Sequence, residues 1–322
     1  MIAKKSGYIL VTALFIISLA SIFVTSLLQK TLSYDRLSRT LLRQQQARML
    51  ALSGIEVARA QLSNPYKLDE KDKEAIDANI TPFLYVDQMQ TFTLTEEKDG
   101  IKGRIKIHIS SEQGKINLNG IYNFDEQKIT NDKNNYGQKV VALLQETIHK
   151  KFGIENFENA LTQLLKKRGR PFEDLTEIPV QKAADDIFDL FTLTTTSTTL
   201  QPLYFSDGLA EGLRLEKQKI DKKQRLEIVK KLNTRKGQIN WQQQWKELLA
   251  PLYKKEYNEM ADVIQKNIAS KIEVASFFVI SYGTVVDDDS QDMTQKVGAY
   301  LEKMNLPGTD TNIYNIKRLY WL

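Results

Sequence analysis

The chain of 322 residues contains no cysteine and only two histidines, His108 and His149. The absence of cysteine excludes disulfide bonds, thiol catalysis and cysteine-based zinc sites. Two histidines far apart in the sequence do not predict a zinc or haem site. No HExxH, P-loop, GxGxxG or GxSxG pattern occurs either. We therefore expect no enzymatic activity, although catalysis by carboxylates alone would leave no motif of this kind.

The chain also lacks a strong charge of either sign. Its 45 Lys and Arg residues and 40 Asp and Glu residues give a formal net charge of +5. No basic stripe interleaved with aromatic residues is present, and such a stripe is the usual mark of a nucleic-acid-binding surface. We therefore expect no nucleic-acid partner.

Proline is absent before Pro65, and charge, proline and glycine are all absent between Tyr8 and Leu28. As a helix, this apolar run would reach roughly 31 Å, about the thickness of the hydrocarbon core of a bilayer. It is too long for a secretory signal peptide, and no small-residue cleavage site follows it. Two alternatives stay open. One is a plain anchor with Lys4 and Lys5 on the cytoplasmic side. The other follows from Gly7-Tyr8, which resembles a type IV prepilin cleavage site.

The helical pattern continues beyond the apolar run. Apolar residues recur at spacings of three, four and seven, which keeps them on one stripe of a helix. They include Leu32, Leu37, Leu41, Met49 and Ile55 and continue to Leu62, before Asn64-Pro65 ends the pattern. The sequence thus predicts a helix of roughly 84 Å, with its first half in lipid and its second half against a soluble domain.

The remainder alternates between strand and helix signals. Strands are predicted at 82–94, 101–111, 273–286 and 314–322, with Thr91–Thr95 and Ile101–Ile109 as an antiparallel hairpin. Helices are predicted at 140–152, 157–167, 183–191, 216–232 and 241–266, the last interrupted at Pro251. The segment Thr192–Thr199 is either a strand or a linker. Strands at both ends of a helical block predict one sheet with an inserted domain.

Four segments together resemble the K-type (GspK-like) minor pseudopilins of type II secretion systems. The first is the start of the chain, with Lys4-Lys5-Ser6-Gly7-Tyr8, the apolar run and the "ARxLAxxGxE"-like residues 47–56. The second is Ser111–Asn119, similar to a "DExGKINLN" strand. The third is Arg170–Ile178, similar to a "PFxSxxEL" element, and the last is the pair of closing strands.

The resemblance implies an α+β, type IV pilin-like fold: a long N-terminal helix, transmembrane then amphipathic, packed on an antiparallel sheet that contains a large α-helical insertion. It divides the chain into a leader peptide at 1–7, a membrane half of the helix at 8–28 and a periplasmic half at 29–64. A first part of the pilin-like domain follows at 65–125, then the insert at 126–268 and the closing strands at 269–322.

Thr12 narrows the resemblance further. It is the fifth residue after Gly7, where most pilins and pseudopilins carry a glutamate and K-type subunits do not. A carboxylate within the bilayer is costly unless it is paired, and a subunit at a filament tip has no subunit ahead of it to pair with. Thr12 is therefore typical of a tip subunit, although an ordinary anchor could also carry a threonine here.

The resemblance implies a function in protein secretion. Prepilin peptidase would cut between Gly7 and Tyr8, and Tyr8 would be N-methylated. The subunit would then help initiate and cap the periplasmic pseudopilus, with Leu32, Leu37 and Leu41 contributing to assembly. Implied partners are the I- and J-type minor pseudopilins, the major pseudopilin, prepilin peptidase and the inner-membrane assembly platform. The protein would be inserted in the inner membrane by a single span, with its N-terminus cytoplasmic and its bulk periplasmic.

Two other functions stay open: a PilX-like minor pilin of a type IV pilus, and a signal-anchored periplasmic binding protein or enzyme. Many K-type subunits carry a calcium-linked "DWxDxD" motif that is absent here from Val140–Lys151. Asp287, Asp288, Asp289 and Asp292 could supply oxygen ligands for calcium, but such a run is more often a solvated turn. No other cofactor is expected.

Overall fold

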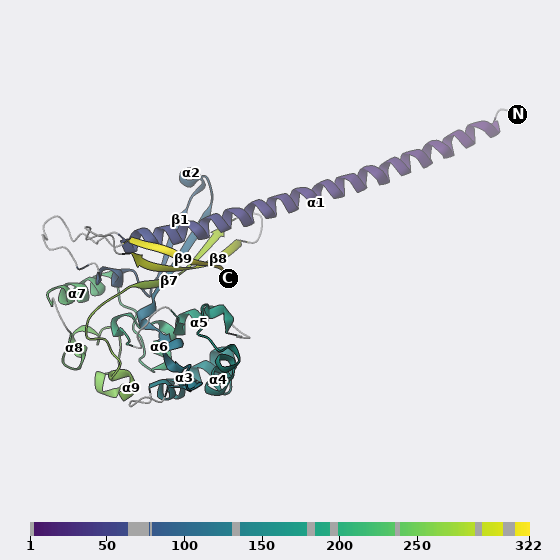
Figure 1. Ribbon diagram of the computed structural model, residues 1–322. Helices are drawn as coiled ribbons and strands as arrows, with labels where there is room; N and C mark the ends of the chain where they lie inside the picture. Colours follow the sequence, from purple (N-terminus) through teal and green to yellow (C-terminus); the bar gives the residue numbers. More distant parts are fainter. Residues whose placement is uncertain are drawn as a thin grey trace.

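The computed structural model describes residues 3–63, 77, 79–130, 136–178, 184–193, 199–235, 239–286, 292–304 and 313–322; for residues 3–10, 184 and 185 only the backbone is described. Helix α1 (Ala3–Ser63) is a single rod of 61 residues, and its first part extends far from the rest of the molecule (Figure 1). It is long and apolar enough to cross a membrane. At 1.5 Å per residue the rod is roughly 90 Å long.

The end of α1 packs on a five-stranded antiparallel sheet. The strands lie in the order β1-β2-β7-β8-β9, with bounds Met89–Leu94, Gly103–Ser111, Ser276–Val285, Met293–Met304 and Ile313–Trp321. Ser111 pairs with Phe277, so the chain leaves the sheet at the end of β2 and re-enters it beside that point. A short helix α2 (Glu96–Asp99) connects β1 and β2, and Gly100 closes this connection with a left-handed φ of 70°.

The excursion between β2 and β7 forms the inserted domain. Its helices are α3 (Tyr136–Phe152), α4 (Phe157–Arg168), α5 (Ala184–Leu190), α6 (Asp207–Gly212), α7 (Lys222–Asn233), α8 (Trp241–Leu248) and α9 (Asp262–Gln265). It also holds two small sheets, β3 (Ile116–Asn117) with β6 (Phe191–Thr192) and β4 (Tyr122–Asn123) with β5 (Lys128–Ile129). The 3₁₀ helices are η1 (Thr81–Leu84, before β1), η2 (Glu112–Gly114), η3 (Asn119–Ile121), η4 (Leu175–Glu177), η5 (Pro202–Tyr204) and η6 (Tyr257–Glu259).

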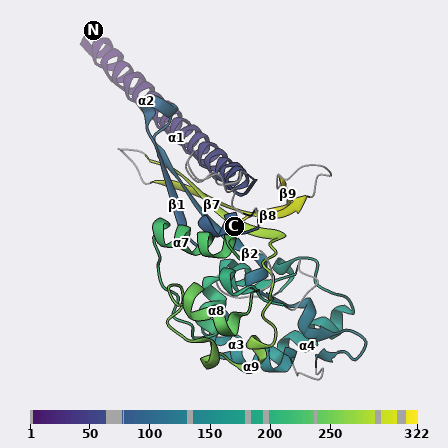
Figure 2. The ribbon, with the colours of Figure 1, turned by 90° about the vertical axis from the view of Figure 1, so that its left-hand side faces the viewer.

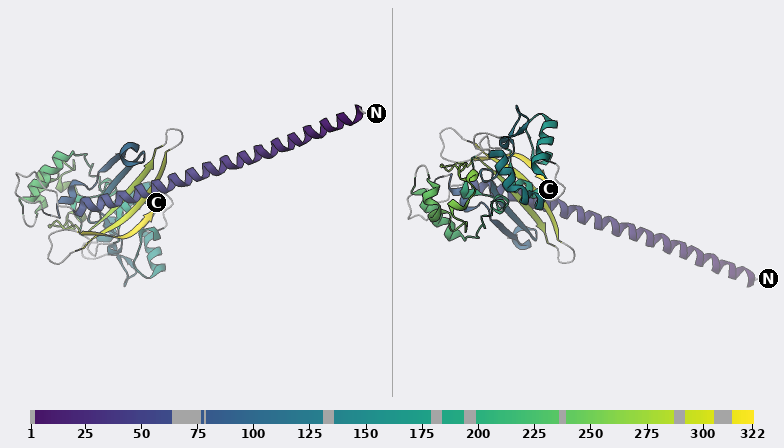
Figure 3. Two further views of the ribbon diagram at one scale, coloured as in Figure 1. Left: turned by 90° about the horizontal axis from the view of Figure 1, so that it is seen from above. Right: turned by 90° about the horizontal axis from the view of Figure 1, so that it is seen from below.

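The sheet is the middle layer of the molecule. Helix α1 covers one face, and the inserted domain covers the other face at the end far from the N-terminus (Figures 1 and 2). Seen from above and below, the first part of α1 leaves this body as an isolated rod (Figure 3). On the lower face, Phe278 of β7 stacks on Phe188 of α5, with ring centroids 4.4 Å apart. Tyr320 of β9 joins the same cluster.

The predicted α+β architecture is confirmed: a long helix packs on an antiparallel sheet interrupted by a largely helical insertion. The β1–β2 hairpin is confirmed as well, with Thr91 opposite Lys106. The predicted insert begins at residue 126, whereas the chain already leaves the sheet after Ser111, because β3 pairs with β6 of the insert rather than with the main sheet. Periodicity identifies a strand but not the sheet it joins.

Several local predictions were wrong. The first half of the strand predicted at 82–94 is the buried 3₁₀ helix η1. Past Pro251, the helix predicted to Lys266 gives only η6 and α9. Strand β8 and helix α6 were not predicted. Residues 297–301 of β8 are buried without alternation, because α1 and the insert cover opposite faces of this strand. A strand buried on both faces loses the period of two that reveals strands in a sequence.

Candidate functional site: the stem helix and its contact with the sheet

The stem, defined here as residues 3–46, is the part of α1 that precedes its first residue buried against the sheet, Ala47. From Val11 to Leu28 its large apolar side chains are between 48% and 67% exposed on all sides of the helix. Apolar surface of this extent is unfavourable in water and marks a membrane or protein contact. Its inner hydroxyls can be accommodated in an apolar medium; the Thr25 hydroxyl, for example, donates to the Ser21 carbonyl at 2.8 Å.

Beyond the stem, small residues bring the helix unusually close to the sheet. Ala47, Ala51 and Ala58 are fully buried. A Cβ atom on Gly283 of β7 would lie 2.2 Å from the Ala47 carbonyl oxygen and 2.4 Å from the Ala51 amide nitrogen. A Cβ atom on Gly54 would lie 2.1 Å from Ser281 Oγ. In each of these contacts one partner is a glycine, which leaves room for the helix backbone at Gly283 and for the Ser281 side chain at Gly54, so α1 lies close above β7.

This contact corrects the predicted stripe. The side chains that pack on the sheet begin at Ala47, and Leu32, Leu37 and Leu41 are all more than half exposed. Met49, also placed on the stripe, is 69% exposed, whereas Ile55 and Leu62 are buried as predicted. Met49 was misplaced and the buried alanines were missed, because only large apolar residues were counted. The three leucines thus stay available for contacts outside the chain.

The other predicted site residues are placed as follows. Gly7 and Tyr8 lie in the first turns of α1, where only the backbone is described, and Thr12 lies one turn further on. Asp287, Asp288 and Asp289 lie outside the described residues. Asp292 immediately precedes β8 and forms an ion pair with Arg104 at 2.9 Å. Within the described ranges, no group of three or more His, Asp or Glu side chains could hold a metal ion.

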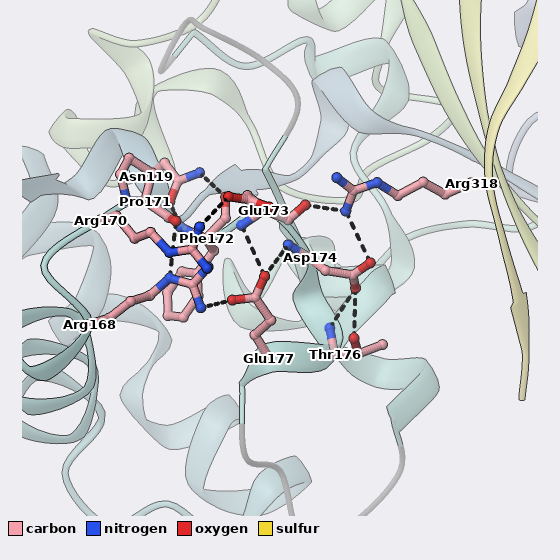
Figure 4. A network of polar contacts seen from close by, with 10 residues as sticks. All are labelled: Asn119, Arg168, Arg170, Pro171, Phe172, Glu173, Asp174, Thr176, Glu177 and Arg318. Atoms are coloured by element: carbon pink, nitrogen blue, oxygen red, sulfur yellow. Dashed lines mark hydrogen bonds and ion pairs between the residues drawn. The ribbon is translucent and has the colours of Figure 1, made fainter.

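The "PFxSxxEL"-like segment forms a clamp between the insert and the last strand (Figure 4). Asp174 caps η4 by accepting from the Thr176 amide at 2.9 Å, and the Glu177 carboxylate accepts in return from the Asp174 amide at 2.9 Å. This reciprocal capping box holds the loop in shape. The free oxygen of Asp174 accepts from Arg318 and from the Tyr320 hydroxyl of β9, both at 3.0 Å.

The same loop is tied to the rest of the insert. Asn119, beside β3, exchanges two hydrogen bonds with the backbone of Phe172, at 2.9 and 3.0 Å. Glu177 forms an ion pair with Arg168 at the end of α4. Figure 4 shows these groups converging on the loop from the helical side, with Arg318 reaching it from the sheet. The motif recognised in the sequence is therefore a structural junction.

A second clamp joins the insert to the segment before β1. The ammonium of Lys217 lies 3.0 Å from Asp87 and 2.8 Å from Asp207, and it donates to the Phe205 carbonyl at 2.8 Å. Nearby, Arg225 of α7 donates to the carbonyls of Phe83 and Val86, both at 2.8 Å. Sequence analysis missed this cluster, because isolated charges carry no motif.

Burial and pairing set the charges of this clamp. Burial raises the pKa of Asp87, and the attraction of Lys217 offsets only part of this effect. Burial also acts to raise the pKa of Asp207, but Lys217 outweighs it, so that pKa lies below its ordinary value. Burial acts to lower the pKa of Lys217, but the two carboxylates raise it above its usual range. Asp87 and Asp207 thus keep the Lys217 ammonium in its charged form.

Comparisons with known proteins give a likeness to solved structures. No known protein family and no curated protein matches the sequence. Three chains of solved structures match. One belongs to the GspK-GspI-GspJ complex from the type 2 secretion system of enterotoxigenic Escherichia coli. It is 13% identical over 88% of this chain and 98% of that chain, with a TM-score of 0.47.

Proposed function

We propose that this protein is a minor pseudopilin of a type II protein secretion system and acts as an assembly subunit rather than an enzyme. The observation that carries the proposal is the division of α1 into two functional halves. Its first part exposes apolar side chains over a membrane-spanning length, and its second part is buried on the protein's own sheet. A simple anchor would need the first half but not the rigid continuation onto a sheet.

In this proposal the stem is stored in the inner membrane, with the N-terminus cytoplasmic and the bulk of the chain periplasmic. Prepilin peptidase removes residues 1–7 by cutting between Gly7 and Tyr8, and the new N-terminus at Tyr8 is methylated. The assembly platform then extracts the stem from the membrane into a filament. There the exposed leucines of the stem, Leu32, Leu37 and Leu41, contact other stems instead of lipid.

We further propose a place at the filament tip, where the subunit helps initiate assembly and caps the pseudopilus. Two features support this placement. Thr12 stands at the position of the usual glutamate, so the chain has no carboxylate there that would need a subunit ahead of it as a partner. The inserted domain is bulky and lies at the end of the molecule far from the N-terminus (Figure 1). The I- and J-type minor pseudopilins and the major pseudopilin are the proposed neighbours.

Intact mass and N-terminal sequencing of the full chain, purified from cells with an active prepilin peptidase, test the processing. The expected product begins at Tyr8 and carries one methyl group. A Gly7→Leu variant is the control, and it should keep its leader because a bulky side chain replaces the glycine before the cut. A wild-type product that still begins before Tyr8 contradicts the proposal.

A further inference from the structure

One flank of the sheet beside α1 carries an apolar surface that is exposed among the described residues. Ile316, Leu319 and Trp321 of the edge strand β9 are between 37% and 51% exposed. Leu319 pairs with Ala299 and Trp321 with Val297, and both of these β8 residues are buried under α1. The exposed side chains therefore stand on the same face of the sheet as α1. We call these three residues the β9 flank.

The stem extends this surface toward the membrane. The guanidinium of Arg48 lies 5.4 Å from the Trp321 ring centroid, which fixes the side of α1 that faces the β9 flank. Tyr34, Leu37 and Leu41 precede Arg48 by 14, 11 and 7 residues, each close to a whole number of helical turns. All three are exposed. One apolar strip therefore runs from the stem onto the β9 flank.

The spacing of this strip matches a helix. Gly283 and Ser281, which α1 contacts most closely, belong to β7, and β9 lies two strands away. Two strand spacings are about 9.5 Å, and packed helices lie about 8–10 Å apart. A second helix laid over β9 would therefore contact α1 and cover the β9 flank at once. We propose that this groove binds the apolar N-terminal helix of a different subunit, an inference that rests on the proposed function.

The alternative occupant, an added β-strand, fits the flank less well. A strand paired to the edge of β9 lies in the plane of the sheet, so it would leave the exposed side chains uncovered, because side chains stand perpendicular to that plane. The ladder of β9 is also interrupted by an irregularity between Tyr300 and Leu301, opposite Lys317. Bulges and lysines at a sheet edge oppose strand addition.

The opposite flank is a matched comparison, since β1 also lies two strands from β7. Phe92 is exposed there on the α1 face, opposite Ile105. Its neighbour Gln90 is already engaged, because Gln61 of α1 donates to it at 2.8 Å. This hydrogen bond links α1 to β1 through a polar side-chain pair, so we expect the β1 flank to be the poorer surface for a second apolar helix.

Arg48 of α1 supplies a polar group beside the β9 flank. It is exposed, its Nε donates to Gln295 Oε1 at 3.5 Å, and it forms no ion pair with another described residue. From Gln29 to Arg59, α1 carries Lys30, Arg36, Arg39, Arg43, Arg48 and Arg59 but only two acidic residues, Asp35 and Glu56. We therefore expect the bound helix to place apolar side chains on the strip and a carboxylate beside Arg48.

Site-specific photo-cross-linking of the full chain in its own membrane tests the proposal. Benzoylphenylalanine replaces Leu319 in one variant and Phe92 in the control. Adducts from position 319 should exceed those from position 92 about tenfold, and mass spectrometry should place the cross-linked peptide in the N-terminal helix of another membrane-anchored subunit. Equal adducts at the two positions, a strand peptide, a second copy of this chain or a protein without such a helix each overturn the proposal.

Charge variants of Arg48 then test recognition. In the Leu319 background, Arg48→Glu should lower the adduct about tenfold, and Arg48→Lys should largely restore it. An unchanged adduct yield with Arg48→Glu would contradict the expected carboxylate of the bound helix beside Arg48. The maturation state of each variant separates the two hypotheses. A chain correctly cut at Tyr8 but cross-linked at position 92 overturns the β9 flank alone, whereas an uncut chain overturns the proposed function.

Discussion

At the scale of single residues, Asp174 connects local and tertiary structure. Its carboxylate caps η4 and also receives Arg318 and Tyr320 from the last strand. We expect Asp174→Ala to lower the free energy of unfolding by about 2–3 kcal/mol, since a cap and a charge-assisted hydrogen bond are both lost. Asp174→Asn should cost less, because asparagine also caps helices. Guanidinium unfolding followed by tryptophan fluorescence measures both, with the exposed Asp125→Ala as control.

The same carboxylate predicts a pH dependence. Burial acts to raise the pKa of Asp174, but hydrogen bonds from Thr176 and Tyr320 and the charge of Arg318 outweigh it, so the folded pKa is lowered. Stabilisation by Asp174 is therefore complete above its unfolded pKa of about 3.9 and is lost as the pH falls through the folded value. The stability difference between wild type and Asp174→Asn should shrink below about pH 4. A difference that grows there would contradict this assignment.

Lys217 is the residue on which the second clamp depends. Replacing it by methionine leaves the Asp87 carboxylate, whose side chain is only 5% exposed, without its cation. We expect Lys217→Met to cost about 3–5 kcal/mol of unfolding free energy, because an uncompensated buried charge is more costly than a lost pair. The double variant Lys217→Met/Asp87→Asn should recover most of this loss in the same unfolding experiment. A double variant as unstable as the single one would show that the pair is not coupled.

At the scale of elements, the contact between α1 and β7 depends on the absence of side chains. A Cβ atom on Gly283 would collide with helix backbone rather than with a movable side chain. Gly283→Ala should therefore shift α1 from the sheet and cost about 1–3 kcal/mol. Ser53→Ala, on the exposed side of α1, is the control and should stay within about 0.5 kcal/mol of wild type. Thermal unfolding compares the two, and equal melting temperatures would rule out the close contact.

At the scale of the whole molecule, the two clamps and the Phe188–Phe278 stack should make the sheet and the insert unfold together. The three tryptophans can test this, because Trp241 and Trp245 lie buried in the insert and Trp321 lies on the sheet. In Trp321→Phe the fluorescence reports the insert alone, and in Trp241→Phe/Trp245→Phe it reports the sheet. After correction for the stability of each variant by circular dichroism, both probes should follow the global transition. A fluorescence transition separate from the global one would show that the insert is an independent domain.

The sequence by itself determined the features that depend on local pattern. The uncharged run from Tyr8 to Leu28, the proline-free continuation to Ser63 and the β1–β2 hairpin follow from composition and spacing within single segments. The Asp174 segment was recognised as a motif, although its role as a junction was not. Tertiary structure decided the rest. Alanine and glycine of α1 pack on the sheet, whereas the leucines of the stem are exposed, because close backbone approach favours small residues. Strand β8 shows no alternating pattern in the sequence, because both of its faces are covered. Tertiary structure also brought Asp87, Asp207 and Lys217 together and placed Arg48 against Trp321, because contacts between residues far apart in the chain leave no pattern along it.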